Sequence, residues 1–113
     1  MGVDKQRQDP QVEANAIIIR CIEEGLGTMG GTAAAIQYVE SISGMTLTEI
    51  PQHSEAFVMS LRHLFRFGSI VVLKNIVVRL DEADSDSREV LGRVRTFSIS
   101  LTEGIKSIES GIV

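Results

Sequence analysis

The sequence predicts an all-α domain of four to five helices that ends in a long amphipathic C-terminal helix. Apolar residues recur at intervals of three and four along most of the chain, which is the spacing of one helix face. Glycine and proline fall between the apolar segments, where helices commonly end. The chain has 113 residues, of which 43% are hydrophobic, and this is enough for one domain with its own core.

Composition and charge narrow the class of protein. The chain has a formal net charge of −4, one cysteine and no tryptophan. An acidic excess argues against a surface built throughout for nucleic acid, and a single thiol suits a reducing compartment. No apolar run approaches the ~20 residues that span a bilayer, and the N-terminus lacks the apolar segment of a signal peptide. We therefore expect a cytoplasmic protein that makes no membrane association.

The first predicted helix covers residues 10–25. Residues 1–9 are polar and are predicted to form a disordered lead-in. Asp9 is suited to cap the helix and Pro10 to occupy its first position. Gly25 is predicted to end the helix, because glycine is a common stop signal.

The second predicted helix covers residues 32–43, after a glycine-rich segment at 26–31. Thr32 is predicted to cap it and Gly44 to end it. The amides of the glycine-rich segment could hold an anion at the helix start, but the segment lacks the lysine of a phosphate loop and a preceding strand. A flexible helix connection is the favoured interpretation.

The middle of the chain predicts a helix that begins at Ser54 and ends before Gly68. Residues 69–81 could form either a pair of strands or one helix. Their β-branched side chains fit a pair of strands, but Lys74-Asn75 is a poor hairpin turn. Their apolar spacing fits a helix buried on more than half of its circumference, which we favour. The apolar face of the helix that begins at Ser54 consists of Phe57, Val58, Leu61, Leu64 and Phe65.

The chain is divided into a helical body, residues 10–82, and a C-terminal helix, residues 83–113. One narrow apolar seam runs along the C-terminal helix in a repeat that keeps the stripe nearly straight. Gly92 and Gly104 lie in this helix, and each costs ~1 kcal/mol relative to alanine, so packing along the seam must hold the helix. The seam consists of Val90, Val94, Phe97, Leu101, Ile105, Ile108 and Ile112.

Two interpretations of this seam remain open. It could fold back onto the preceding helices, or it could pair with a second copy of the chain. We favour self-association as a homodimer, because a stripe one residue wide suits helix-on-helix pairing.

A second candidate surface is cationic. Residues 54–80 contain four strong cations and a single acidic residue, Glu55. Such an excess could face phosphates in a helix-turn-helix arrangement with Phe67-Gly68-Ser69 as the turn. A solvated helix face is the more common reason for such a charge pattern. The four cations are Arg62, Arg66, Lys74 and Arg79.

The residue types that carry catalysis or bind metals form no recognisable motif. His53 and His63 lack the spacing of a metal-binding pair on one helix. Cys21 has no CxxC partner, and tertiary folding would have to bring it to a histidine to form a nucleophilic pair. We expect a non-enzymatic protein with no cofactor and no metal.

Residues 26–80 carry an ordered set of short motifs. In chain order these are the Leu26-Gly27 opening, a helical patch at 35–40, the junction Glu49-Ile50-Pro51, a Phe-led helix at 57–64, and a glycine turn into an aliphatic helix. In this order they resemble a small archaeal domain family of the Nitrosopumilus output-domain type. The turn of that family reads Phe-Gly-x-Gly-Ala, whereas this chain has Phe65-Arg66-Phe67-Gly68-Ser69 and keeps only the second glycine.

The resemblance implies an all-helical fold with an output or interaction role, and it transfers no catalytic residues. Together with the seam, it leads to a predicted function as a non-enzymatic signalling or protein-interaction module that acts through helix–helix association. The alternative is a DNA-binding transcriptional regulator that uses the basic face of residues 62–79.

Overall fold

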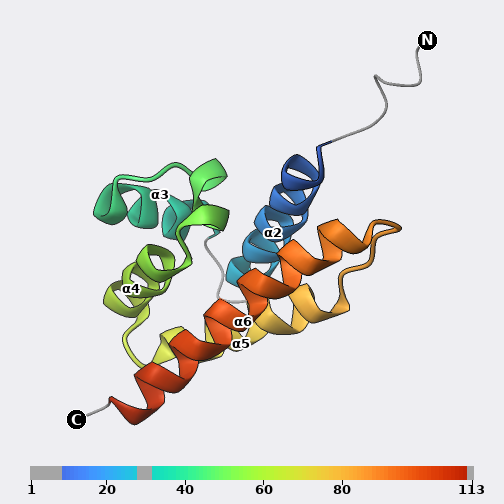
Figure 1. The fold of residues 1–113 in the computed structure, drawn as a ribbon. Helices are drawn as coiled ribbons and strands as arrows, with labels where there is room; N and C mark the ends of the chain where they lie inside the picture. The colour runs from blue at the N-terminus through green and yellow to red at the C-terminus, as the bar shows by residue number, and fades with distance from the viewer. Residues whose placement is uncertain (1–8, 28–31, 112–113) are drawn as a thin grey trace.

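The computed structural model describes residues 9–27 and 32–111, which are helical over most of their length (Figure 1). These two ranges contain no strand, so the predicted all-α fold is confirmed. The strand pair considered for residues 69–81 is excluded, because these residues lie within one helix. The elements are α2 (Pro10–Gly27), α3 (Thr32–Ser43), the 3₁₀ helix η1 (Leu47–Gln52), α4 (Ser54–Phe65), α5 (Gly68–Glu82) and α6 (Arg88–Ser110).

Two connections predicted from the sequence lie largely outside this description. Of the lead-in expected at residues 1–9, only Asp9 is described, and residues 28–31 of the glycine-rich connection are not described.

Two predicted helix ends are confirmed, the cap at the start of α2 and the glycine that ends α3. The Asp9 carboxylate accepts a hydrogen bond from the Gln11 amide at 2.9 Å. Gly44 follows the end of α3 with φ +74°, and its amide donates to the Glu40 carbonyl at 2.9 Å.

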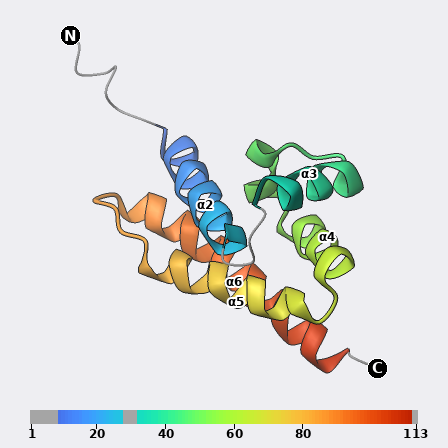
Figure 2. The ribbon, with the colours of Figure 1, turned by 180° about the vertical axis from the view of Figure 1, so that it is seen from behind.

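Helices α5 and α6 form an antiparallel pair, and α2 packs against both (Figures 1 and 2). Their relative direction follows from two contacts: Lys74 of α5 lies 3.5 Å from Glu109 of α6, and Ser98 of α6 donates to Asp81 of α5 at 2.8 Å. Helix α4 packs against α3, α5 and α6, and η1 packs against α2 and α4. The α4–α5 turn therefore lies beside the C-terminal end of α6.

A single apolar core joins the body to the C-terminal helix. Side chains from every described helix belong to one cluster, to which α6 contributes six apolar residues. The rings of Phe57 in α4 and Phe97 in α6 lie 6.4 Å apart between centroids, near the middle of this core. The predicted division into residues 10–82 and 83–113 thus does not correspond to two separately packed units, because α6 completes the core of the body.

Gly25 does not end α2 as predicted. The helix continues to Gly27, and Leu26 is buried in the core. Gly25 faces Ile76 of α5, whose backbone nitrogen and Cα would lie 3.3 Å from a Cβ at this position. The glycine lets α2 and α5 approach closely, and this use of glycine cannot be distinguished from a helix stop in the sequence alone.

The two glycines within α6 have different surroundings. A Cβ at Gly104 would lie 3.1 Å from both terminal methyl carbons of Val58 in α4, whereas a Cβ at Gly92 would meet nothing within 4 Å. Gly104 therefore serves the packing of α4 on α6, and Gly92 faces open space. No helix among the described residues has the length and apolar character needed to span a membrane.

Candidate interaction surface

The predicted pairing seam on α6 is buried inside the chain itself. Each of its six described residues is at most 6% exposed, and α6 packs against α2, α4 and α5. The seventh, Ile112, lies outside the described residues. The assignment of these residues to a dimer interface is therefore corrected: the stripe is regular because it fills the intramolecular core. A second copy cannot reach it while α6 is docked.

The four cations of the predicted basic face are separated by the fold. Lys74 is paired with Glu109 of α6, whereas Arg79 lies 3.7 Å from Glu24 of α2 and donates to the Asn75 carbonyl at 3.2 Å. These two side chains thus turn from α5 toward different neighbouring helices. Only Arg62 and Arg66 share one site.

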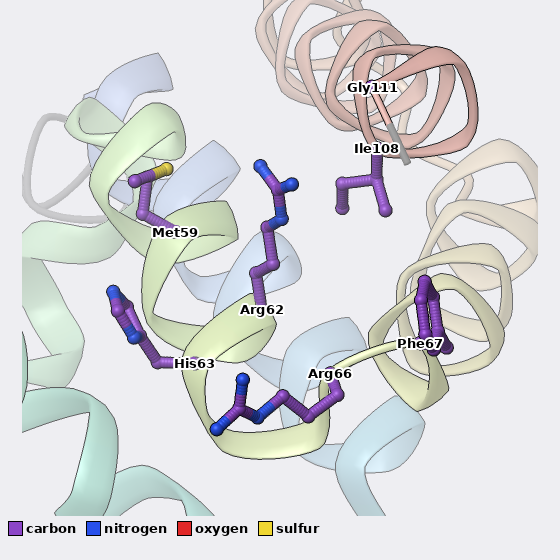
Figure 3. Close-up of a pocket in the computed structure, with 7 residues that line it drawn as sticks. All are labelled: Met59, Arg62, His63, Arg66, Phe67, Ile108 and Gly111. Atoms are coloured by element: carbon purple, nitrogen blue, oxygen red, sulfur yellow. The ribbon is translucent and has the colours of Figure 1, made fainter. Parts of the chain in front are cut away.

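That site is a groove of about 450 Å³ between the end of α4, the start of α5 and the end of α6 (Figure 3). Its apolar wall consists of Met59, Phe67 and Ile108, its cationic rim consists of Arg62 and Arg66, and His63 lies beside them. Gly111, directly after α6, also lines the groove. We call this site the α4–α5 groove.

The cationic rim has no acidic partner within the described part of the chain. Arg62, His63 and Arg66 are exposed, and no carboxylate of residues 9–27 or 32–111 forms an ion pair with them. Arg62 lies in the last turn of α4, where the helix dipole favours its positive charge. Figure 3 shows Arg62 directed toward the end of α6 and Arg66 directed along the end of α4. The two guanidinium groups therefore point in different directions.

Arg66 joins α4 to α5 in an unusual backbone conformation. Its φ is 56° and its ψ is −124°, and it is the one non-glycine residue with positive φ among those described. Such a conformation is favourable for glycine and costs other residues on the order of 1–3 kcal/mol. The turn lies at Arg66 and Phe67, one residue earlier than the predicted Phe67-Gly68-Ser69, and α5 begins at Gly68.

A row of exposed apolar side chains continues from the groove along α5. Phe67 is 67% exposed, Val71 55% and Val78 51%, and their spacing of four and seven residues places them on one helix face together with Lys74. We call these four residues the α5 outer face. The opposite face of α5 is buried in the core, including Val72, Leu73 and Ile76.

The α5 outer face is not predicted from the sequence, because the apolar spacing of residues 69–81 predicts a helix buried on more than half of its circumference. One signal could have found it. Residues 67–80 carry apolar side chains around nearly the whole helix, more than one core face requires. In a helix that packs on one side, such a surplus must be exposed.

The candidate nucleophile and the two histidines lie on different elements. Cys21 is buried in α2, and this burial raises the pKa of its thiol by disfavouring the thiolate. A nucleophilic cysteine requires the opposite shift. His63 lies on the groove rim and His53 precedes α4. The described residues contain no group of three or more His, Cys, Asp or Glu side chains that could hold a metal ion.

Comparison of the chain with protein-family models, curated proteins and solved structures finds no match.

Proposed function

We propose that this chain is a protein-interaction module that binds a helix of a partner protein on the α4–α5 groove and the α5 outer face. The observation that supports it best is the continuity of exposed apolar side chains with unpaired cations. Phe67 belongs to both the groove and the outer face, and Arg62 and Arg66 flank it without an acidic partner among the described residues. Scattered exposed apolar residues are ordinary, whereas a row that runs into a groove is typical of a binding surface.

The dimensions and charge of this surface favour an acidic amphipathic helix as the partner. Phe67 to Val78 extends over three turns of α5, about 16 Å at 1.5 Å per residue. A partner helix with apolar residues at the same spacing could cover this row, as in other complexes in which an amphipathic helix lies along a groove. Acidic side chains on its edges would face the rim cations, which steer association and set orientation more than they raise affinity.

DNA binding has less support. A recognition helix at this place would be α5, but the α5 outer face is largely apolar. Lys74 and Arg79 are also engaged by carboxylates of neighbouring helices. A phosphate backbone requires several free cations on one surface, and only Arg62 and Arg66 meet that condition among the four predicted.

A direct test uses a fluorescein-labelled peptide of about 18 residues, or five helical turns, with Leu and Phe on one face and Glu on the other. Its binding is followed by fluorescence anisotropy. A second peptide replaces the apolar residues by Ser at the same charge, and a third probe is duplex DNA. We expect the first peptide to bind and the Ser peptide to bind much more weakly. Raising the salt from about 50 mM to about 500 mM should weaken binding by screening the rim cations.

Matched variants locate the binding surface. Phe67→Ala should weaken peptide binding about tenfold, as expected for an exposed aromatic anchor, whereas Ile99→Ala removes a similarly exposed side chain from α6 and should leave binding unchanged. The double variant Arg62→Ala, Arg66→Ala should weaken binding, whereas Arg88→Ala, Arg95→Ala changes the net charge equally and should not.

Three results would contradict the proposal. The first is equal binding of both peptides. The second is DNA binding that the Arg62→Ala, Arg66→Ala variant loses while the peptide does not bind. The third is a dimer of the chain alone, seen by sedimentation, that Phe67→Ala dissociates, because a second copy would then occupy this surface.

A further inference from the structure

The turn between α4 and α5 requires the backbone conformation at position 66 but does not require an arginine side chain there. The Arg66 backbone amide donates to the Arg62 carbonyl at 2.9 Å, and its own carbonyl accepts from the Ser69 amide at 3.0 Å and the Ser69 hydroxyl at 2.6 Å. Glycine at this position could make the same three bonds, because all of them use backbone atoms of residue 66. Glycine would also adopt φ 56° without the strain that a side chain brings.

The side chain of Arg66 does not offset this strain within the described part of the chain. It is exposed, and it forms no ion pair or side-chain hydrogen bond with residues 9–27 or 32–111. Residues held in sparsely populated backbone regions cluster at binding sites, where the strain fixes a side chain in a useful position. Among the described residues, Arg66 therefore makes no side-chain contact that offsets the strain of its backbone.

We propose that Arg66 is a specificity-determining residue of the α4–α5 groove, and that its guanidinium binds a carboxylate of the partner helix. This inference rests on the proposed function. Because Arg66 follows the end of α4 with a positive φ, its side chain leaves the turn along the end of α4, away from Arg62 (Figure 3). Arg62 and Arg66 thus recognise two acidic residues that lie apart on the partner, rather than one anion held between them. The contact also explains why an arginine occupies a position suited to glycine.

This proposal predicts opposite changes of stability and affinity in one variant. Arg66→Gly removes both the strain and the guanidinium, so the thermal unfolding midpoint should rise by about 3 to 6 °C while affinity for the acidic amphipathic peptide falls about fivefold. Arg66→Gln keeps the strain and removes the charge, so its midpoint should stay near that of the wild type while its affinity falls similarly. Arg66→Lys keeps the charge and should restore most of the affinity.

The experiment combines circular dichroism melts with anisotropy titrations of the wild type, the three Arg66 variants and Arg62→Ala, all with the same labelled peptide. Arg62→Ala is the control, because Arg62 lies in regular α4 helix and its loss should lower affinity without raising the midpoint. The inference is overturned if Arg66→Gly lowers the midpoint, or if it raises the midpoint and leaves affinity unchanged. If the wild type does not bind the peptide at all, the proposed function fails first, and that result is distinct because every variant is then equally inactive.

Discussion

Helices α5 and α6 are both apolar at helical spacing, yet they use their apolar residues in opposite ways. The stripe of α6 is narrow and regular, and its six described residues are all buried. The apolar residues of α5 are less regular and fill a larger share of the helix, eight of its 15 residues against eight of the 23 in α6, and part of them forms the exposed α5 outer face. A regular stripe therefore shows only that a helix has one face to cover. A surplus of apolar residues beyond that face is the better signal of an interaction surface.

The largest change in stability is expected in the α6 stripe, and the same substitution on the α5 outer face should have little effect. Leu101→Asp places a carboxylate in the fully buried stripe of α6 and should cost more than about 4 kcal/mol, a large part of the 5–15 kcal/mol that stabilises a typical domain. Val78→Asp makes the same change on the α5 outer face and should alter stability by no more than about 0.5 kcal/mol. Urea unfolding followed by circular dichroism measures both. A folded Leu101→Asp protein that sediments as a monomer, where the wild type is a dimer, would instead place the α6 stripe at an interface.

A smaller loss of stability is expected from a change at the contact between α2 and the buried face of α5. Gly25→Ala puts a methyl group against the Ile76 backbone and side chain, so α2 and α5 must move apart. Overpacking of this kind costs about 1–3 kcal/mol, which outweighs the ~1 kcal/mol that alanine adds to helix propensity. The free energy of unfolding should therefore fall. A variant more stable than the wild type would show that the contact between α2 and α5 is looser than the structure indicates.

The smallest changes in stability are expected from alanine substitutions at the two glycines of α6. Gly92→Ala adds a methyl group in open space and should stabilise the chain by about 1 kcal/mol through helix propensity. Gly104→Ala gains the same propensity, but Val58 must shift to make room, so its net change should be smaller or of opposite sign. Thermal midpoints of the two variants, measured side by side, give the difference. Equal stabilisation by both would mean that α4 and α6 are not in close contact at Gly104.

Particular residues show how far the sequence could predict this fold. The apolar spacing predicted helices at every position where the described chain forms a long one, and Asp9 and Gly44 act as the predicted cap and stop. These signals are local, since a cap or a positive φ depends on residues within one or two turns. Gly25 was wrongly predicted to end α2, because its role depends on Ile76, which lies far along the chain.

The candidate site shows the same limit more strongly. The sequence identified Arg62 and Arg66 as cations and the α6 stripe as apolar, and it left both interpretations of that stripe open. It could not show that Lys74 and Arg79 meet Glu109 and Glu24, because these ion pairs join different helices. It also could not show that Phe67 and Ile108 line one groove, since α4, α5 and α6 meet there only after the chain has folded.

The helices, most of their ends and the apolar character of each face could therefore be predicted from the sequence, because hydrogen bonds and side-chain periodicity within a helix are local. Which faces are covered depends on how the helices pack against one another. Packing α6 against α2, α4 and α5 buried the stripe that had suggested a dimer, and it left exposed the α5 outer face and the α4–α5 groove. Burial is a property of how helices are arranged, and an apolar residue has the same spacing whether its neighbours come from its own chain or from a partner.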